Sequence, residues 1–329
     1  MSLLFKLCSR KQIKVEELRE LRAILARGED VNGRDAHNRT VLMYAARQCS
    51  ENDVSIMRLL FEQPSIEVNL ADGNGRTALH LATLGGRCEA VRLLLADARV
   101  DVNIRDNAGT TALDAATTNR NMDVVKLLLS HPRVDVNCKN GDQVTPLITA
   151  ALQFEGNINI FKLLLAQQSV DVNYVAPNLV YGTGGITALS VASGHSNLEA
   201  TKLLLDDPRV DVNWVDSSGL SVLHRLLDCP MDKSEVKILE LFLAHPRVDV
   251  NCKGGPLGAS ILYPAAFYNN AEVVKLILDE PRFTSVNVVD EKGGTAVTAA
   301  MLEGNWDILR ELVHHPSVDL GVNLDDLAR

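Results

Sequence analysis

The 329-residue sequence predicts an all-α repeat solenoid, in which short helix pairs are stacked and joined by β-hairpin-like loops. Three observations predict this fold. An asparagine that ends a short β-branched segment recurs at a nearly constant interval, a threonine or serine introduces a helix after each one, and a second, more apolar helix follows. Such recurrence is typical of proteins in which each unit buries its apolar surface only against its neighbours.

The stretch from Val100 to Leu129 shows one unit most clearly. Its β-branched segment ends at Asn103, and Asp, Asn and Gly109 then supply turn chemistry, because glycine accepts positive φ and Asp and Asn bond their own backbone. Thr111 is expected to cap a short helix that begins at Ala112. Two asparagines end that helix, and a second helix with a wide apolar surface completes the unit.

The unit is repeated along most of the chain. The segment-ending asparagines are 34 to 40 residues apart, and they are Asn32, Asn69, Asn103, Asn137, Asn173, Asn213, Asn251 and Asn287. The helix-start residues that follow them are Thr40, Thr77, Thr111, Thr145, Thr187, Ser221, Ser260 and Thr295. We therefore expect eight repeats over residues 32–317.

Residues 1–31 are expected to form an N-terminal capping helix pair. Leu3 to Leu7 predicts a short apolar helix, and residues 15–27 predict a longer one whose Lys and Arg keep the outer surface solvated, as a terminal repeat requires. An alternative is that residues 2–7 dock on a membrane or a partner.

At the other end, residues 306–313 are expected to form the last helix, and residues 318–329 an incomplete C-terminal stub. The prediction is a single repeat domain over residues 1–329.

The composition argues against several classes of partner. The net charge of -9 disfavours nucleic acid and anionic membranes. The charge is uneven, with 21 Lys and Arg against 20 Asp and Glu up to residue 164, and 12 against 22 from residue 165. The six cysteines form no CxxC pair, and no secretory segment or 20-residue apolar span is evident, so we expect an intracellular protein with reduced thiols. A cytoplasmic location is expected, with the nucleus left open.

No set of residues has the spacing of a catalytic or metal site, so we expect no enzymatic activity, cofactor, metal or small-molecule substrate. The glycine-rich loop 182–185 lacks the Lys-Ser/Thr pair of a phosphate-binding loop, and a loop tip is the favoured interpretation.

Arg and Asp two residues apart recur in the β-branched segments, as in Arg99 with Asp101 and Arg209 with Asp211. In an extended segment both side chains point the same way, which predicts a charged row that is structural rather than a docking surface.

The helix-start motifs resemble the T-P-L-H-x-A pattern of ankyrin repeats, whose unit is about 33 residues long. The motifs that carry the resemblance include Thr77-Ala78-Leu79-His80, Thr145-Pro146-Leu147 and Ser221-Val222-Leu223-His224. The chain is similar to the ankyrin repeat family over nearly its whole length. One departure is His131-Pro132-Arg133, where Pro rather than the family's Gly follows the second helix.

The resemblance implies a non-enzymatic protein–protein interaction scaffold that acts as a monomer. The alternative is a targeting or substrate-recruiting domain of a larger enzyme, channel or effector protein. The resemblance also implies that His80 and His224 connect the turn to the helix by hydrogen bonds rather than serve as ligands or bases.

In this family the concave surface of loop tips and first helices usually binds the partner. Carried over by position, the partner-binding residues are Arg34, His37, Arg39, Arg76, Arg105, Asn107, Lys139, Val175, Tyr181, Val215, Lys253, Phe267 and Tyr268. We expect acidic groups of a partner to meet the early, basic tips, and an apolar part to meet the later ones. Tyr174 and Trp214 fit either packing between tips or an aromatic anchor.

A further implication of the resemblance is modification by an asparaginyl hydroxylase, which accepts an Asn with Leu eight residues earlier and an acidic-hydrophobic pair before it. The asparagines that fit are Asn103, Asn137, Asn173, Asn213 and Asn251.

Overall fold

The computed structural model describes residues 3–10, 13–48, 54–153, 158–177, 184–268 and 271–319. These residues form 18 α-helices and one two-stranded sheet. The chain divides into two compact units, Met1–Asp171 and Val172–Arg329, which we call the first and the second unit. A single domain over residues 1–329 stays a prediction. The mostly helical repeat fold itself is confirmed.

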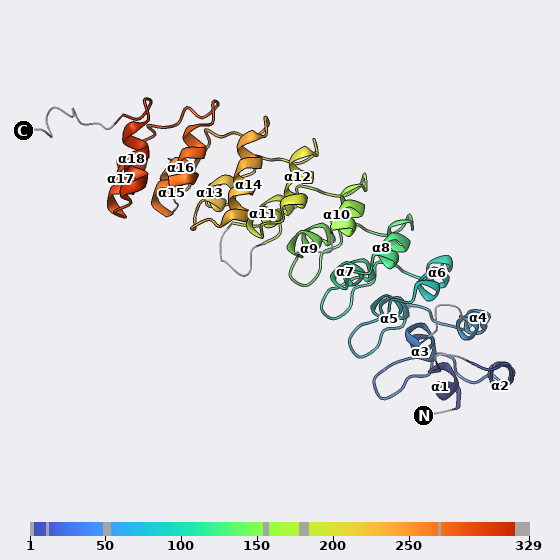
Figure 1. The fold of residues 1–329 in the computed structure, drawn as a ribbon. Helices are drawn as coiled ribbons and strands as arrows, with labels where there is room; N and C mark the ends of the chain where they lie inside the picture. Colours follow the sequence, from blue (N-terminus) through green and yellow to red (C-terminus); the bar gives the residue numbers. More distant parts are fainter. Residues whose placement is uncertain are drawn as a thin grey trace, which may run out of the picture. The chain divides into compact units, whose positions relative to one another are not determined.

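In the first unit, two rows of helices run side by side (Figure 1). The first row is α1 (Leu3–Cys8), α3 (Val41–Gln48), α5 (Ala78–Leu84), α7 (Ala112–Thr118) and α9 (Pro146–Leu152). The second row is α2 (Val15–Ala26), α4 (Ser55–Phe61), α6 (Cys88–Ala96), α8 (Met122–Leu129) and α10 (Ile158–Leu165). Consecutive helices within each row are in contact, so every repeat buries its helices against the next one.

The second unit continues the same pattern of pairs. Its first-row helices are α11 (Ala188–Gly194), α13 (Val222–Leu226), α15 (Leu262–Tyr268) and α17 (Ala296–Leu302), and its second-row helices are α12 (Leu198–Asp206), α14 (Lys233–Ala244), α16 (Ala271–Leu278) and α18 (Trp306–His314). A short hairpin precedes α15, in which β1 (Lys253–Gly254) pairs antiparallel with β2 (Ala259–Ser260).

The first-row helices begin where the sequence predicted. Each helix from α3 onward starts directly after its Thr or Ser, except α15, which starts two residues after Ser260. The hydroxyl of Thr111 accepts a hydrogen bond from the amide of Asp114 at 3.3 Å, so the predicted cap is confirmed. Pro146 occupies the first position of α9, where its missing N–H leaves no bond unmade.

The second-row helices α8, α12 and α14 end without a left-handed residue. The residues that follow α8, α12 and α14 have φ of -75°, -76° and -83°, and a proline comes one or two residues later. This is the predicted departure from a glycine-terminated helix, because proline cannot continue the hydrogen-bonding pattern.

The recurring asparagines connect each repeat to the next. Asn103 donates its side-chain amide to the carbonyl of Arg133 at 2.7 Å and accepts from the amide of Asp135 at 2.9 Å. Asn213 repeats the arrangement with Arg247 and Asp249, at 2.8 Å each. These side chains therefore satisfy backbone groups of a neighbouring loop that helix pairing leaves free.

The expectation that Arg99 and Asp101 lie in one extended segment is wrong. Arg99 instead bonds Asp97 at 2.7 Å, and Arg209 likewise bonds Asp207 at 2.7 Å. The carboxylate of Asp101 accepts from the amide of Asn103 at 3.0 Å. The reason is local, because this segment runs through two turns rather than as one extended strand.

Candidate functional site

Each loop tip of the first unit is built around an acceptor side chain. In the third tip, Asp106 accepts from the amides of Ala108 and Thr110, both at 2.9 Å, and Gly109 has a φ of 73°. Neighbouring tips are also joined through their backbones, as where Gly141 donates to the carbonyl of Ala108 at 2.9 Å. The tips therefore form a fixed row on which side chains have defined positions.

The basic side chains predicted to meet a partner lie on this row, but several also hold neighbouring tips together. Arg39 lies 3.7 Å from Asp72, and Arg76 lies 3.5 Å from Asp106. Arg34 donates to the carbonyl of Ala71 at 3.2 Å. These three arginines therefore already interact with neighbouring tips, so only part of their positive charge remains available to a partner.

The remaining predicted residues of the first unit differ in exposure. His37, Arg105 and Asn107 are exposed, and Lys139 is half-buried. Asn107 donates to the carbonyl of Gly73 at 3.2 Å, which adds another bond between tips.

In the second unit three of the four corresponding tip positions carry an exposed valine, and the fourth carries Lys253. The exposed fractions of Val175 and Val215 are 40% and 48%. Val215 and Lys253 line one hollow of about 290 Å³. Tyr181 lies outside the described residues.

Phe267 and Tyr268 end α15, as predicted, and belong to a cluster of three rings. The ring centroids of Phe267 and Tyr268 are 4.6 Å apart at an angle of 71°, and those of Tyr263 and Phe267 are 6.4 Å apart and nearly parallel at 10°. These rings line a hollow of about 310 Å³ together with Leu257 and Pro264. Such edge-to-face and stacked pairs stabilise one another beyond their burial.

A second hollow, of about 500 Å³, adjoins the first. Ile186, Trp214 and Val222 line it, and Leu220 and Asp228 line both hollows. We call the combined surface the aromatic groove, defined by Ile186, Trp214, Leu220, Asp228, Tyr263, Phe267 and Tyr268. The structure does not place Val215 in this groove, and half-buried Trp214 lines it.

Sequence reasoning missed Ile186, Leu220 and Tyr263 as parts of this surface. The only available signal was the aromatic run Tyr263, Phe267 and Tyr268 in a chain with 4% aromatic residues. Aliphatic positions such as Leu220 carry no such signal, because they resemble core positions of any repeat.

The charges along the aromatic groove are not all paired. Arg225 donates to Asp216 through its Nε at 2.7 Å. Asp228 is exposed and has no ion pair within the part of the chain that the structure describes. The groove therefore carries one free carboxylate between two apolar hollows.

The two histidines of the helix-start motif are structural. The Nδ1 atom of His80 accepts from the amide of Thr77 at 3.2 Å, and its Nε2 atom lies 3.0 Å from the carbonyl of Thr110 in the next repeat. The Nδ1 atom of His224 lies 2.8 Å from the hydroxyl of Ser221, and its Nε2 atom lies 3.1 Å from the carbonyl of Ala259 in the next repeat. Burial lowers the pKa of both imidazoles, so both are neutral.

One cluster has the residue types of a nucleophilic site. Cys252 lies 3.4 Å from the hydroxyl of Ser221 and 3.9 Å from Nδ1 of His224. Burial raises the pKa of the Cys252 thiol, and the second nitrogen of His224 is held by Ala259. A protonated thiol beside an occupied imidazole is a poor nucleophile, so these residues serve packing.

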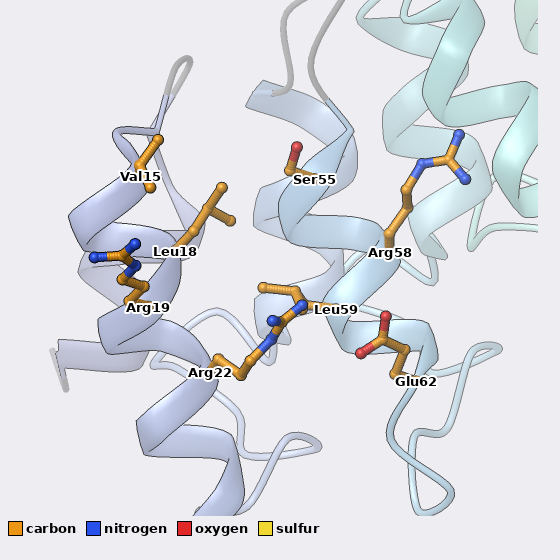
Figure 2. A pocket seen from close by; sticks show the side chains of 8 residues that line it. All are labelled: Val15, Leu18, Arg19, Arg22, Ser55, Arg58, Leu59 and Glu62. Atoms are coloured by element: carbon orange, nitrogen blue, oxygen red, sulfur yellow. The ribbon is translucent and has the colours of Figure 1, made fainter.

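Figure 2 shows another hollow, between α2 and α4 of the second row. Arg19, Arg22 and Arg58 line it together with Leu18 and Leu59. Arg22 extends toward Leu59, whereas Arg19 and Arg58 point away from it (Figure 2). Because the guanidinium groups diverge and are exposed, this surface fits the solvated outer side expected of a capping pair.

The described residues contain no group of three or more His, Cys, Asp or Glu arranged to hold a metal ion. Among them, no helix has the length and apolar character needed to cross a bilayer.

Comparison with protein families agrees with the fold. A family model described as ankyrin repeats (3 copies) matches residues 14–106, 98–176 and 226–324. The chain belongs to the ankyrin repeat family. Domains of this family are generally non-enzymatic modules for protein interaction.

Proposed function

We propose that this protein is a non-enzymatic scaffold that binds a partner protein through its loop tips and the aromatic groove. The observation that carries the proposal is the groove itself, in which Tyr268 remains 43% exposed beside Tyr263 and Phe267. Aromatic side chains that line a concave surface supply large contact areas at low cost in conformational entropy. The fixed position of α15 and its hairpin adds preorganisation, which favours binding.

Site-directed photo-crosslinking tests which surface binds. A benzoylphenylalanine residue is placed at Tyr268 in the groove or, as a control, at Lys275, which is exposed on the second-row helix α16. After irradiation in native lysate, we expect a discrete crosslinked protein from position 268 and none from position 275. Equal products from both positions, or none from either, would contradict the proposed surface.

The basic tips of the first unit are a separate part of the proposal. Replacing Arg34, Arg76 and Arg105 together by Glu reverses the charge of three tips. If acidic groups of the partner meet these tips, affinity for the crosslinked partner falls steeply and the salt dependence of binding weakens. Unchanged affinity would remove the tips from the binding surface while leaving the groove in place.

We also propose that asparaginyl hydroxylation occurs at Asn103, Asn137, Asn173, Asn213 and Asn251. The asparagines already bond a neighbouring loop, as Asn137 does with Ser169 at 2.7 Å, so the hydroxylase must act while that loop is locally open. Intact-mass spectra of protein from a native source, with increments of one oxygen atom, test this proposal. A single unmodified mass would exclude it for that source.

The monomeric state is part of the same proposal, and light scattering coupled to size-exclusion chromatography tests it. A mass near 35.9 kDa is expected at every loading concentration.

A further inference from the structure

The aromatic groove has an apolar–charged–apolar order along its length. The hollow beside Trp214 and the hollow beside Tyr263 share Asp228 at their junction. Apolar side chains line both hollows, and Ser190, His195, Asp216 and Arg225 also line the hollow beside Trp214. A segment that fills both hollows must therefore pass over a negative charge.

Among the residues that the structure describes, Asp228 has no ion-pair partner. Arg225, the nearest basic residue along the chain, donates to Asp216 instead. The carboxylate of Glu235 accepts a hydrogen bond from the amide of Asp232 at 2.7 Å. The neutral His224 is hydrogen-bonded to Ser221 and Ala259. No group that lines either hollow supplies a free cation to Asp228 among the residues that the structure describes.

The surroundings strengthen the preference for a cation. The second unit, residues 172–329, carries 12 Lys and Arg against 21 Asp and Glu. The rings of Tyr263, Phe267 and Tyr268 also present faces that attract cations. A negatively charged segment would be repelled both by the junction and by the field of the unit.

We propose that the aromatic groove binds an extended protein segment in which a Lys or Arg lies between two apolar residues, each separated from it by one residue. In an extended chain alternate side chains point the same way, so this pattern places two apolar anchors in the hollows and the cation at Asp228. The inference rests on the proposed function, because it specifies the chemistry of the partner that the groove accepts.

Peptide selection with the whole chain tests the pattern. A random library of 12-residue peptides displayed on phage is selected on immobilised wild-type protein and on Asp228→Asn, Asp228→Lys and Tyr268→Ser variants. Asp279→Asn, at an exposed position just after α16, is the matched control for loss of one carboxylate. Thermal unfolding of every variant confirms that the exposed substitutions leave the fold intact.

For the wild type, we expect enriched peptides with the apolar–x–Lys/Arg–x–apolar pattern. Their affinity falls about tenfold in Asp228→Asn, the size of effect expected for loss of one charge-assisted contact. Asp279→Asn retains wild-type affinity. In Asp228→Lys, the enriched pattern changes to Glu or Asp at the central position.

The outcomes separate this inference from the proposed function. Enriched peptides that lack a cation, bind Asp228→Asn as tightly as wild type and are lost in Tyr268→Ser would overturn the cationic pattern and keep groove binding. Failure to enrich any peptide, or peptides that bind Tyr268→Ser unchanged, would overturn both.

Discussion

The tips at Asp106 in the first unit and at Asp216 in the second use the same turn, but the tips of the two units expose different side chains. In the first unit, Arg39 and Arg76 reach the aspartates of the following tips, Asp72 and Asp106. In the second unit, Val175, Val215 and Val289 occupy tip positions at exposed fractions of 40%, 48% and 58%. The first unit has 21 basic and 21 acidic residues, whereas the second has an excess of nine acidic residues.

The comparison separates side chains that hold the stack from side chains that are free for a partner. A regular tip directs its polar side chains to the next tip, so little of its charge remains unsatisfied. A tip that carries valine or precedes an aromatic cluster contributes less to stacking, and its apolar surface stays exposed. Binding capacity is therefore expected where the repeat is least regular.

Close backbone contacts should be indispensable in both units, and breaking them gives the largest expected effect. A Cβ atom on Gly141 would lie 2.4 Å from the carbonyl oxygen of Ala108, and one on Gly254 would lie 2.5 Å from the ring of His224. We expect Gly141→Ala and Gly254→Ala each to lower the free energy of unfolding by about 2 to 3 kcal/mol, measured by urea titration.

Gly194 provides the control, because nothing lies within 4 Å of a Cβ atom at that position. Gly194→Ala should be neutral or slightly stabilising. If Gly141→Ala behaved like Gly194→Ala, the tips would not be as rigidly joined as the distances imply.

The asparagine connections should contribute equally to both units. Asn103→Ala and Asn213→Ala each remove two hydrogen bonds to the next repeat. We expect each to reduce the free energy of unfolding by about 1 to 2 kcal/mol. Hydrogen exchange read by mass spectrometry should show faster exchange in the neighbouring loop. A loss in only one of the units would show that the repeats are not energetically equivalent.

The pH dependence should differ between the units. Burial lowers the pKa of His80 and His224, so protonation favours the unfolded state, and stability is lost as pH falls below the ordinary value of 6.5. Each histidine lowers the free energy of unfolding by at most about 1.4 kcal/mol per pH unit.

In the first unit Asp114 opposes this trend. Burial raises its pKa despite a hydrogen bond from Thr149, so protonation on acidification favours the folded state. Stability from Asp114 is present below the ordinary value of 3.8 and lost as pH rises through the folded pKa. Hydrogen exchange at pH 7 and pH 5 should therefore show greater loss of protection around His224 than around Asp114. Equal losses of protection around His224 and Asp114 would contradict this predicted difference in pH dependence.

Exposed ion pairs between tips should give the smallest change. The side chain of Arg76 is 40% exposed at its contact with Asp106. Arg76→Gln should change the free energy of unfolding by at most about 0.5 kcal/mol. Asp228→Asn should change it as little, because that carboxylate is exposed. A large loss from Arg76→Gln alone would mean that the first-unit tips depend on this charge.

The repeat fold could be predicted from the sequence because its signals are local. The helix starts at Thr77, Thr111 and Thr295 follow from capping chemistry, and the turn at Gly109 follows from its tolerance of positive φ. The period of the asparagines then fixes how often these elements recur. Each of these signals depends on residues within a few positions of one another, so no tertiary information is needed.

The candidate site was only partly predictable. Phe267 and Tyr268, which were predicted as partner-binding residues, line the aromatic groove, and Val215 lines a separate hollow. The expectation for Arg99 and Asp101 was wrong because it assumed an extended backbone where two turns occur.

The sequence by itself thus determined the repeat, its capping and its stacking asparagines. Only the tertiary structure decided which side chains face one another across repeats. Ile186 and Trp214 meet at one hollow because separate repeats bring their loops side by side. That proximity depends on how helix pairs pack, and a residue's distance along the chain does not encode it.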